Sequence, residues 1–240
     1  MTNNILLYVT QSSIDKFNSK FGKMEEFHLY KVLFLVQQEL FKYDIDFKLP
    51  YYWYFHGPLL NVQGFYYQTG VSFDKFSPNW KQHPPKYVIN PQICVGDFPN
   101  KKIVDDVINL IIDTIENEAI EEYLKREVYK YAPQSFRRSF KKFESFLDLG
   151  DYGKAKEFFF KLIAEFPRDE SLKIYDLFLE WETVVDLAFE MEKYSFIEDI
   201  NKPFWRAYCH NFSVVDYKNL NDDQLQRLKQ TAEVNYPTEE

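Results

Sequence analysis

Glycine, cysteine and long apolar runs are scarce in this sequence. Only 7 glycines stand against 24 phenylalanines and 18 tyrosines, a composition typical of well-packed helices and not of a loop-rich or disordered chain. Cys94 and Cys209 lie far apart, so we expect reduced, buried thiols and neither a disulfide framework nor a zinc knuckle. No apolar run is long enough for a membrane span, and no signal peptide is recognisable. We therefore expect a cytoplasmic protein that does not bind a membrane.

Motifs for common enzyme chemistry are also scarce. The histidines lack the spacing of a metal site, and the chain has neither a glycine-rich phosphate loop nor a Gly-x-Ser-x-Gly motif. Asp46-Phe47-Lys48 fits the Asp-x-Lys element of a metal-dependent nuclease, although a pattern this short is common. We expect no catalytic residues, no metal and no cofactor, and we keep a metal-dependent nuclease as one alternative.

Negative charge is concentrated in the C-terminal part of the chain. The net charge is −8, and residues 151–240 hold 11 lysines and arginines against 19 aspartates and glutamates. The preceding residues are therefore close to neutral. A surface this acidic repels free nucleic acid at long range and suits either solubility or a basic protein partner.

Helical patterns dominate the chain and predict a mainly α fold with a small β component. Residues 24–43 repeat apolar side chains at helical spacing around a wide face, which predicts a central, mostly buried helix. Residues 44–56 end in a run of aromatic side chains, which predicts a strand. Gly57-Pro58 predicts a turn, with Pro58 opening a short helix. Further helical patterns fill the C-terminal half, where Pro203 predicts the start of one helix.

The stretch "KVLFLVQQEL" followed by "IDFKLPYYWYFHGPLL" resembles the start of prokaryotic winged-helix accessory domains. Those domains have a lysine-led apolar helix and then an aromatic strand that ends in Tyr/His-x-Gly-Pro. In them a serine just after Gly-Pro usually caps the next helix; here Leu60 takes that place, and Asn61 is the nearest substitute. The resemblance covers residues 24–98 and implies a winged-helix-like domain over residues 1–98, and the helical patterns that follow predict a helical domain over residues 99–236. It also points to transcription regulators, antitoxins and subunits of phage-defence or chromosome-organising complexes.

The segment of this domain that would read DNA carries no positive charge. Residues 57–74 contain no lysine or arginine, whereas a winged helix that reads DNA needs basic side chains on its recognition helix. We therefore expect the domain to bind protein. The aromatic strand would supply a docking edge or, alternatively, only core packing. The expected partner-binding residues are Trp53, Tyr54, Phe55 and His56.

A second resemblance, to the second half of one tetratricopeptide repeat, lies in "GDYGKAKEFFFKLIAEFP". The matching positions are Gly150, Tyr152, Ala155, Phe159, Leu162 and Pro167. The preceding helix matches poorly and no second copy follows, whereas repeat stacks need about three units. The resemblance implies a helical hairpin near residues 136–167, and a lone hairpin is the alternative to a repeat array.

A basic cluster lies in residues 125–142, where seven lysines and arginines stand against a single glutamate. On a helix, four of these cations would share one face while Phe136, Phe140 and Phe143 point into the core. Such a face could bind nucleic acid or an acidic partner, or it could be a solvated face balanced by acidic residues upstream. The candidate binding residues are Arg137, Arg138, Lys141 and Lys142.

Together these patterns lead to one main hypothesis about function. The chain would be a non-catalytic accessory subunit of a prokaryotic multiprotein complex, with antiviral defence or DNA maintenance as its setting. Its expected partners are proteins, and DNA or RNA would be contacted through the complex. A stand-alone DNA-binding regulator or antitoxin is the first alternative, and the metal-dependent nuclease is the second.

Overall fold

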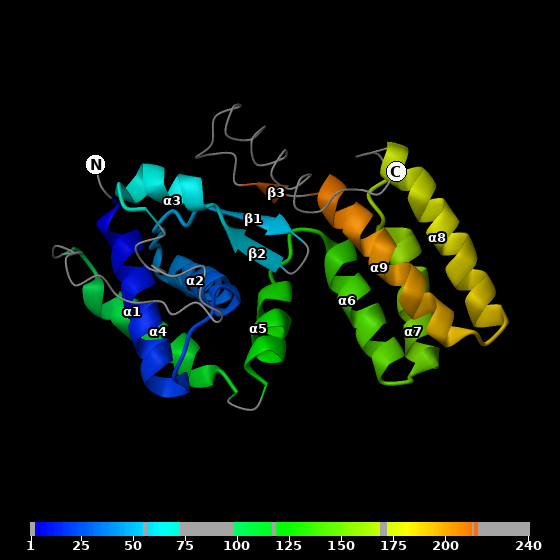
Figure 1. The fold of residues 1–240 in the computed structure, drawn as a ribbon, viewed down its shortest axis with the longest axis horizontal. Coiled ribbons are helices and arrows are strands. Elements are labelled where there is room, and N and C mark those ends of the chain that lie inside the picture. The colour runs from blue at the N-terminus through cyan, green and yellow to red at the C-terminus, as the bar shows by residue number, and fades with distance from the viewer. Residues whose placement is uncertain are drawn as a thin grey trace. The chain divides into compact units, whose positions relative to one another are not determined.

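The computed structural model describes residues 3–54, 57–72, 98–116, 119–168, 172–212 and 214–215. These residues divide into two compact units, one that runs up to Val128 and also takes in Val215, and one from Tyr129 to Val214. Figure 1 shows that helices make up most of both units. The prediction of a mainly α fold with a small β component is therefore confirmed.

Three helices build the core of the first unit: α1 (Asn4–Phe21), α2 (Glu26–Leu40) and α4 (Lys101–Thr114). Nearly every residue of α2 is buried, as its wide apolar face predicts. The apolar face of α4 packs against both α1 and α2. The first unit therefore extends beyond the boundary predicted at residue 98 and takes in most of α5 (Ile120–Tyr129).

The first unit also holds a strand pair, in which β1 (Tyr51–Tyr54) runs antiparallel to β2 (Gly57–Leu60). With β3 (Val214–Val215), the strand order is β2-β1-β3. The turn predicted at Gly57-Pro58 is wrong, because both residues lie in β2, opposite Tyr54 and Trp53. Gly57 has a φ of 101°, a conformation that glycine adopts without a steric penalty.

The next helix, α3 (Val62–Thr69), begins four residues after Pro58 and not at it. Asn61 is its N-cap, and the side-chain oxygen of Asn61 accepts a hydrogen bond of 3.0 Å from the Gly64 backbone N–H. The prediction of Asn61 as the substitute cap is therefore confirmed. A short 3-10 turn, η1 (Phe41–Tyr43), follows α2. The irregular stretch expected between Ser72 and Pro99 lies almost wholly outside the described residues.

Four helices form the second unit: α6 (Ser135–Asp148), α7 (Tyr152–Glu165), α8 (Leu172–Glu190) and α9 (Tyr194–Asn211). α6 packs along α7 as a hairpin, and α8 packs along α9. The helix predicted to start at Pro203 is longer than expected, because α9 begins at Tyr194 and holds Pro203 inside. Proline normally disrupts a helix interior. Here the next residue, Phe204, stacks on Trp181 at 4.6 Å between ring centroids, which holds this part of α9 against α8.

Aromatic rings fill the core of the second unit. Phe140 stacks on Trp205 at 4.5 Å, and Phe166 stacks on Phe178 at 3.9 Å between ring centroids. Such pairs are worth about 0.5–1.5 kcal/mol each beyond their buried area. The many aromatic residues of the sequence therefore serve mainly to form ring-to-ring contacts between these four helices.

Candidate interaction surfaces

Two of the four residues predicted to form a docking edge on the aromatic strand do not face solvent. Trp53 and Tyr54 are buried, and the ring of Phe34 on α2 meets Trp53 edge-on at 5.6 Å. This burial corrects the prediction that these two residues form a docking edge, because β1 faces the central helix of its own unit. Phe55 and His56, the other two residues of that prediction, lie outside the described residues.

The predicted face of four cations does not form, because Arg137 is fully buried. Its guanidinium donates hydrogen bonds to the carbonyl oxygen of Phe212 (2.7 Å), to Sγ of Cys209 (3.3 Å) and to Oε1 of Gln134 (3.1 Å). The flank of α6 that carries Arg137 lies against α9, so the hydrogen bonds of this arginine link α6 to α9. The companion prediction, that Phe136, Phe140 and Phe143 point into the core, is confirmed.

The other three predicted cations have local partners. Lys141 forms an ion pair of 2.6 Å with Glu144, and its Nζ lies 4.7 Å from the centroid of the Trp205 ring. Arg138 is exposed but donates a 2.6 Å hydrogen bond to the carbonyl oxygen of Ala132. Lys142 is exposed, with Nζ 5.8 Å from the Phe158 ring centroid. Exposed positive charge is therefore much weaker on α6 than the sequence suggests.

Upstream in the same cluster, carboxylates offset the positive charge. Lys125 lies 3.5 Å from Glu121, and Arg126 lies 3.2 Å from Glu116 and 3.3 Å from Glu127. These pairs agree with the alternative in which the cluster is a solvated, balanced face. Surface pairs of this kind add little stability, about 0–1 kcal/mol each.

The two charged residues of the Asp-x-Lys pattern, Asp46 and Lys48, pair with each other. Lys48 Nζ lies 2.6 Å from Asp46 Oδ2, and Asp46 Oδ1 also accepts a hydrogen bond of 2.8 Å from the Lys48 backbone N–H. Across the part of the chain that the structure describes, no group of three or more histidine, cysteine, aspartate or glutamate side chains is placed to hold a metal ion. The described residues thus give the nuclease alternative no additional support.

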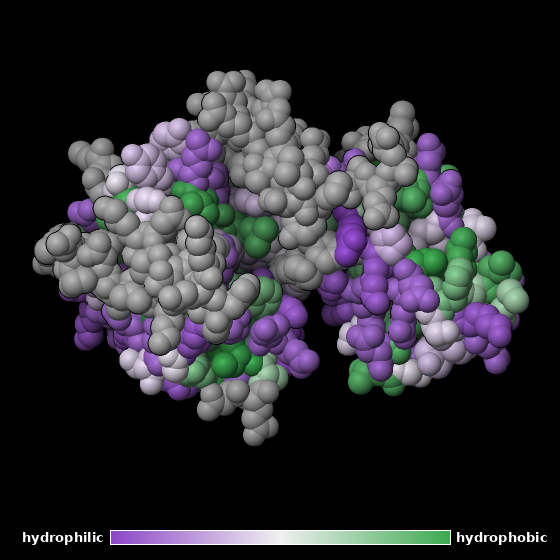
Figure 2. Space-filling view, in the orientation of Figure 1, coloured by the Kyte–Doolittle hydropathy of each residue, from purple (hydrophilic) through white to green (hydrophobic). Residues whose placement is uncertain are grey.

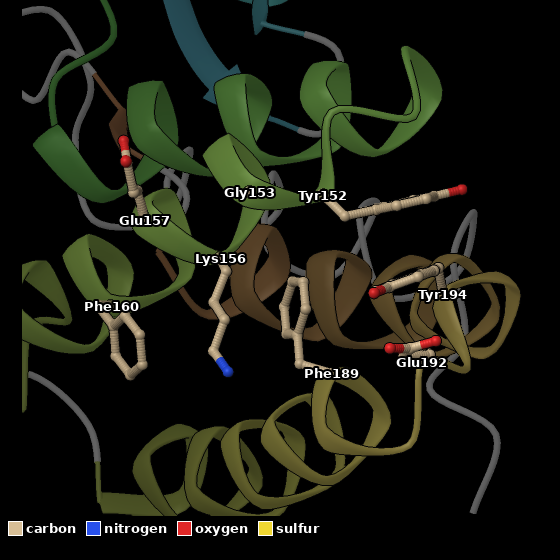
Figure 3. A pocket seen from close by; sticks show the side chains of 8 residues that line it. All are labelled: Tyr152, Gly153, Lys156, Glu157, Phe160, Phe189, Glu192 and Tyr194. Atoms are coloured by element: carbon tan, nitrogen blue, oxygen red, sulfur yellow. The ribbon is translucent and has the colours of Figure 1, made fainter.

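A hollow on the second unit is the candidate site that the sequence did not reveal. It has a volume of about 440 Å³ and lies where α7 meets the end of α8 and the start of α9 (Figure 3). α7 supplies one face at helical spacing, and the end of α8, the turn that follows it and the first residue of α9 supply the rest. The lining residues are Tyr152, Gly153, Lys156, Glu157, Phe160, Phe189, Glu192 and Tyr194.

Aromatic rings and one lysine give the hollow its chemical character. Tyr152 and Tyr194 stack almost parallel at one end, with ring centroids 3.6 Å apart. Figure 3 shows Lys156 between the rings of Phe160 and Phe189, and its Nζ lies 5.8 Å from the Phe189 centroid. Among the described residues, Lys156 has no carboxylate within ion-pair distance. The carboxylates of Glu157 and Glu192 also line the hollow, which thus combines aromatic walls with side chains of both charges.

Exposed apolar side chains surround this end of the second unit. Phe160, Met191 and Phe196 each leave more than half of their surface exposed, and Leu149 leaves 75%. A signal for Phe160 was present in the sequence, because consecutive residues on a helix point about 100° apart. The run Phe158-Phe159-Phe160 therefore could not turn all three rings into one core.

Lys31 on α2 is a second feature that sequence reasoning missed. It is fully buried, its Nζ lies 3.5 Å from the centroid of the Phe27 ring, and it has no hydrogen-bond partner in the described parts of the chain. Burial, together with the charge of the neighbouring Lys125, lowers the pKa of Lys31 to about 7, while Glu121 opposes the shift. At pH 7 about half of this amine is therefore uncharged.

Comparison with known proteins leaves the chain without an identified relative. No family model matches it, and no curated protein or solved structure gives a significant match. The resemblances to a winged-helix domain and to a tetratricopeptide hairpin therefore stay predictions. Of the helices that the structure describes, none is long and apolar enough to cross a membrane.

Proposed function

We propose that this chain is a non-catalytic subunit of a multiprotein assembly and that the hollow on its second unit receives an apolar segment of a protein partner. The observation that carries the proposal is the exposure of Phe160, which leaves 54% of its surface in solvent beside a hollow walled by aromatic rings. Water contact with this ring is unfavourable, at about 25 cal/mol for each Å² of apolar surface. A partner that covers the ring would recover that free energy.

The composition of the hollow fits protein recognition. Tyrosine and other aromatic residues are enriched at interface cores, where they offer large, rigid contact areas. Lys156 adds a polar anchor among the apolar walls, since its amine lies near the Phe189 ring and forms no ion pair with the carboxylates of Glu157 and Glu192, which also line the hollow. A partner segment with an apolar side chain next to a carboxylate would satisfy both features.

The biological setting of the proposal rests on the sequence resemblance alone. Winged-helix accessory domains occur in prokaryotic phage-defence and DNA-maintenance complexes, and such a complex would be where this subunit acts. DNA or RNA would then be reached through other subunits, since the basic cluster on α6 has local partners and Arg137 is buried. The proposal places the protein in the cytoplasm.

The experiment compares two aromatic substitutions of matched exposure. Phe160 in the hollow and Tyr66 on α3 leave 54% and 52% of their surfaces exposed, so replacing either by lysine should leave the fold intact. Tagged wild-type protein, Phe160→Lys and Tyr66→Lys are each used to capture partners from an extract of the source organism, with nuclease treatment. Bound proteins are quantified by mass spectrometry.

The expected result is a stoichiometric protein that survives nuclease treatment, is lost with Phe160→Lys and is retained with Tyr66→Lys. A partner held equally by both variants would show that the hollow is not the binding site. Recovery of nucleic acid alone would favour the DNA-binding regulator, and Mg²⁺-dependent cleavage that is lost with Asp46→Asn would favour the nuclease.

A further inference from the structure

A stripe that is mostly apolar lies on the solvent side of α8. Its apolar residues are Leu177, Val184, Leu187 and Met191, and the acidic Glu180 stands between Leu177 and Val184, so that the five positions follow at intervals of three, four, three and four residues. Leu177 and Val184 are partly buried, whereas Leu187 and Met191 leave 52% and 57% of their surfaces exposed. Alternating steps of three and four are the spacing by which a helix packs along another helix. The core of the second unit uses other residues of α8, so this stripe is not explained by the fold.

The neighbouring helix α9 carries a similar stripe. Phe196, Ile200, Pro203 and Ala207 repeat at intervals of four, three and four residues, and Phe196 leaves 51% of its surface exposed. We call these two sets together the α8–α9 strip. It differs from the hollow, which borders the opposite flank of α8 through Phe189.

Helix geometry places both stripes on the same side of the helix pair. On α8, the ring of Phe189 contacts Phe159 of α7, and the stripe lies on the other flank. On α9, Trp205 and Cys209 contact α6, and the stripe again lies on the other flank. Because α8 and α9 pack directly on each other, these two flanks adjoin. Figure 2 shows hydrophobic side chains gathered among hydrophilic ones over the α8 side of this unit.

The charge beside the strip has one sign on α8. From Ile174 to Glu192 the sequence has no lysine or arginine and six acidic residues: Asp176, Glu180, Glu182, Asp186, Glu190 and Glu192. Asp176, Glu180 and Glu190 are exposed, and they fall within or next to the apolar stripe. A helix that lies along this stripe therefore meets carboxylates near both ends of α8.

We infer that the α8–α9 strip docks a basic amphipathic helix of a protein partner. Such a helix offers apolar side chains to Leu187 and Met191, and lysines or arginines to the flanking acids. The α8 helix of a second copy fits poorly, because its acids would face the acids of the first. The inference rests on the proposed role as an interaction subunit and names the chemistry of a partner for a second surface.

The test uses the full-length protein and three fluorescent peptides. The probe is a helical peptide of three heptads with leucine at positions a and d and lysine at e and g. A scrambled peptide keeps its composition but loses the apolar face, and an acidic peptide replaces the lysines by glutamate. Binding is measured by fluorescence anisotropy at low and high salt. The protein variants are Leu187→Glu, the double charge reversal Asp176→Lys with Glu190→Lys, and Phe160→Lys.

The inference expects the basic peptide to bind and the scrambled peptide to bind at least about tenfold more weakly. Leu187→Glu should raise the Kd about tenfold or more, a loss of roughly one buried apolar anchor. The protein with the double charge reversal should bind the acidic peptide more tightly than the basic peptide. Phe160→Lys should leave peptide binding unchanged, because the hollow lies on the other flank of α8.

Three results of the peptide-binding assay would overturn the inference. They are no binding of the basic peptide, equal binding of the scrambled peptide, and a Kd that does not respond to Leu187→Glu in a variant whose circular dichroism is unchanged. Sedimentation that shows wild-type dimers, lost with Leu187→Glu, would assign the strip to a second copy instead. The proposed function is judged separately, since it depends on a captured protein that Phe160→Lys releases.

Discussion

Replacing the buried Lys31 by methionine should stabilise the first unit, and the gain should shrink as the pH rises. Methionine matches the unbranched shape of lysine and brings no charge into the core. The amine of Lys31 is fully buried on the ring of Phe27, and no described residue accepts a hydrogen bond from it. The wild-type chain must therefore either bury a positive charge or release a proton when it folds.

The size of the effect follows from the pKa. Burial lowers the pKa of Lys31 from 10.5 to about 7, which disfavours the charged form by about 5 kcal/mol, at about 1.4 kcal/mol for each pH unit. Between these two values the unfolded chain holds more protons than the folded chain, so wild-type stability rises with pH. The penalty is complete below about pH 7 and vanishes above about pH 10.5. At pH 7 it is about 4 kcal/mol and at pH 9 about 2 kcal/mol.

The assay is urea unfolding of wild-type protein and Lys31→Met at pH 7 and pH 9. The difference in unfolding free energy between the two proteins should fall by about 2 kcal/mol between these pH values. Titrating groups that do not interact with Lys31, such as the buried tyrosines, are common to both proteins and cancel in the difference. His28 does interact with Lys31, but burial lowers the pKa of His28, so that this imidazole stays neutral between pH 7 and pH 9 in both proteins. A difference that does not change with pH would refute the reasoning, because it would show that Lys31 stays protonated in the folded state.

Three further predictions concern stability and reactivity. Arg137→Ala should destabilise the second unit by about 3 kcal/mol, because it removes three hydrogen bonds, of which those to Phe212 and Cys209 are buried and link α6 to the end of α9. Arg138→Ala, measured in the same thermal unfolding assay, should cost less than about 1 kcal/mol. Burial raises the pKa of Cys209 to about 11. Iodoacetamide at pH 8 should therefore leave Cys209 unmodified in the folded protein and modify it in urea, as read by peptide mass spectrometry. Rapid modification of the folded protein would contradict this prediction. Asn61→Ala should cost about 1 kcal/mol through loss of the α3 cap, and Asn61→Ser should restore part of it.

Helical periodicity predicted most of the fold because it reports directly on which faces are buried. The central helix of residues 24–43 and the helices of the second unit appear where apolar spacing placed them. Proline was the misleading signal. Pro58 pairs opposite Trp53 in a strand, and Pro203 lies inside α9. In both cases tertiary contacts decide the outcome, and those contacts are not visible in local sequence.

The candidate surfaces were harder to predict, because burial of a single residue depends on its angular position among several helices. Arg137 and Arg138 are neighbours in the sequence, yet one is buried against α9 and the other is exposed. Trp53 was expected at a docking edge and lies in the core. The hollow combines α7 with the turn before α9, two segments whose proximity no local pattern encodes.

In the second unit, the residues that form the packed core differ from the residues that face solvent. A binding role of its surface can therefore be tested by substitutions that leave the core unchanged. Phe140, Trp181 and Trp205 form the packed core, so their replacement would unfold the helices and remove any binding without identifying a surface. Phe160 on α7 and Leu187 on α8 lie outside this core and belong to different surfaces. Replacing either residue changes one surface and keeps the ring contacts of the core in place. A binding defect at either position, in a protein whose unfolding temperature is unchanged, therefore reports on recognition and not on folding.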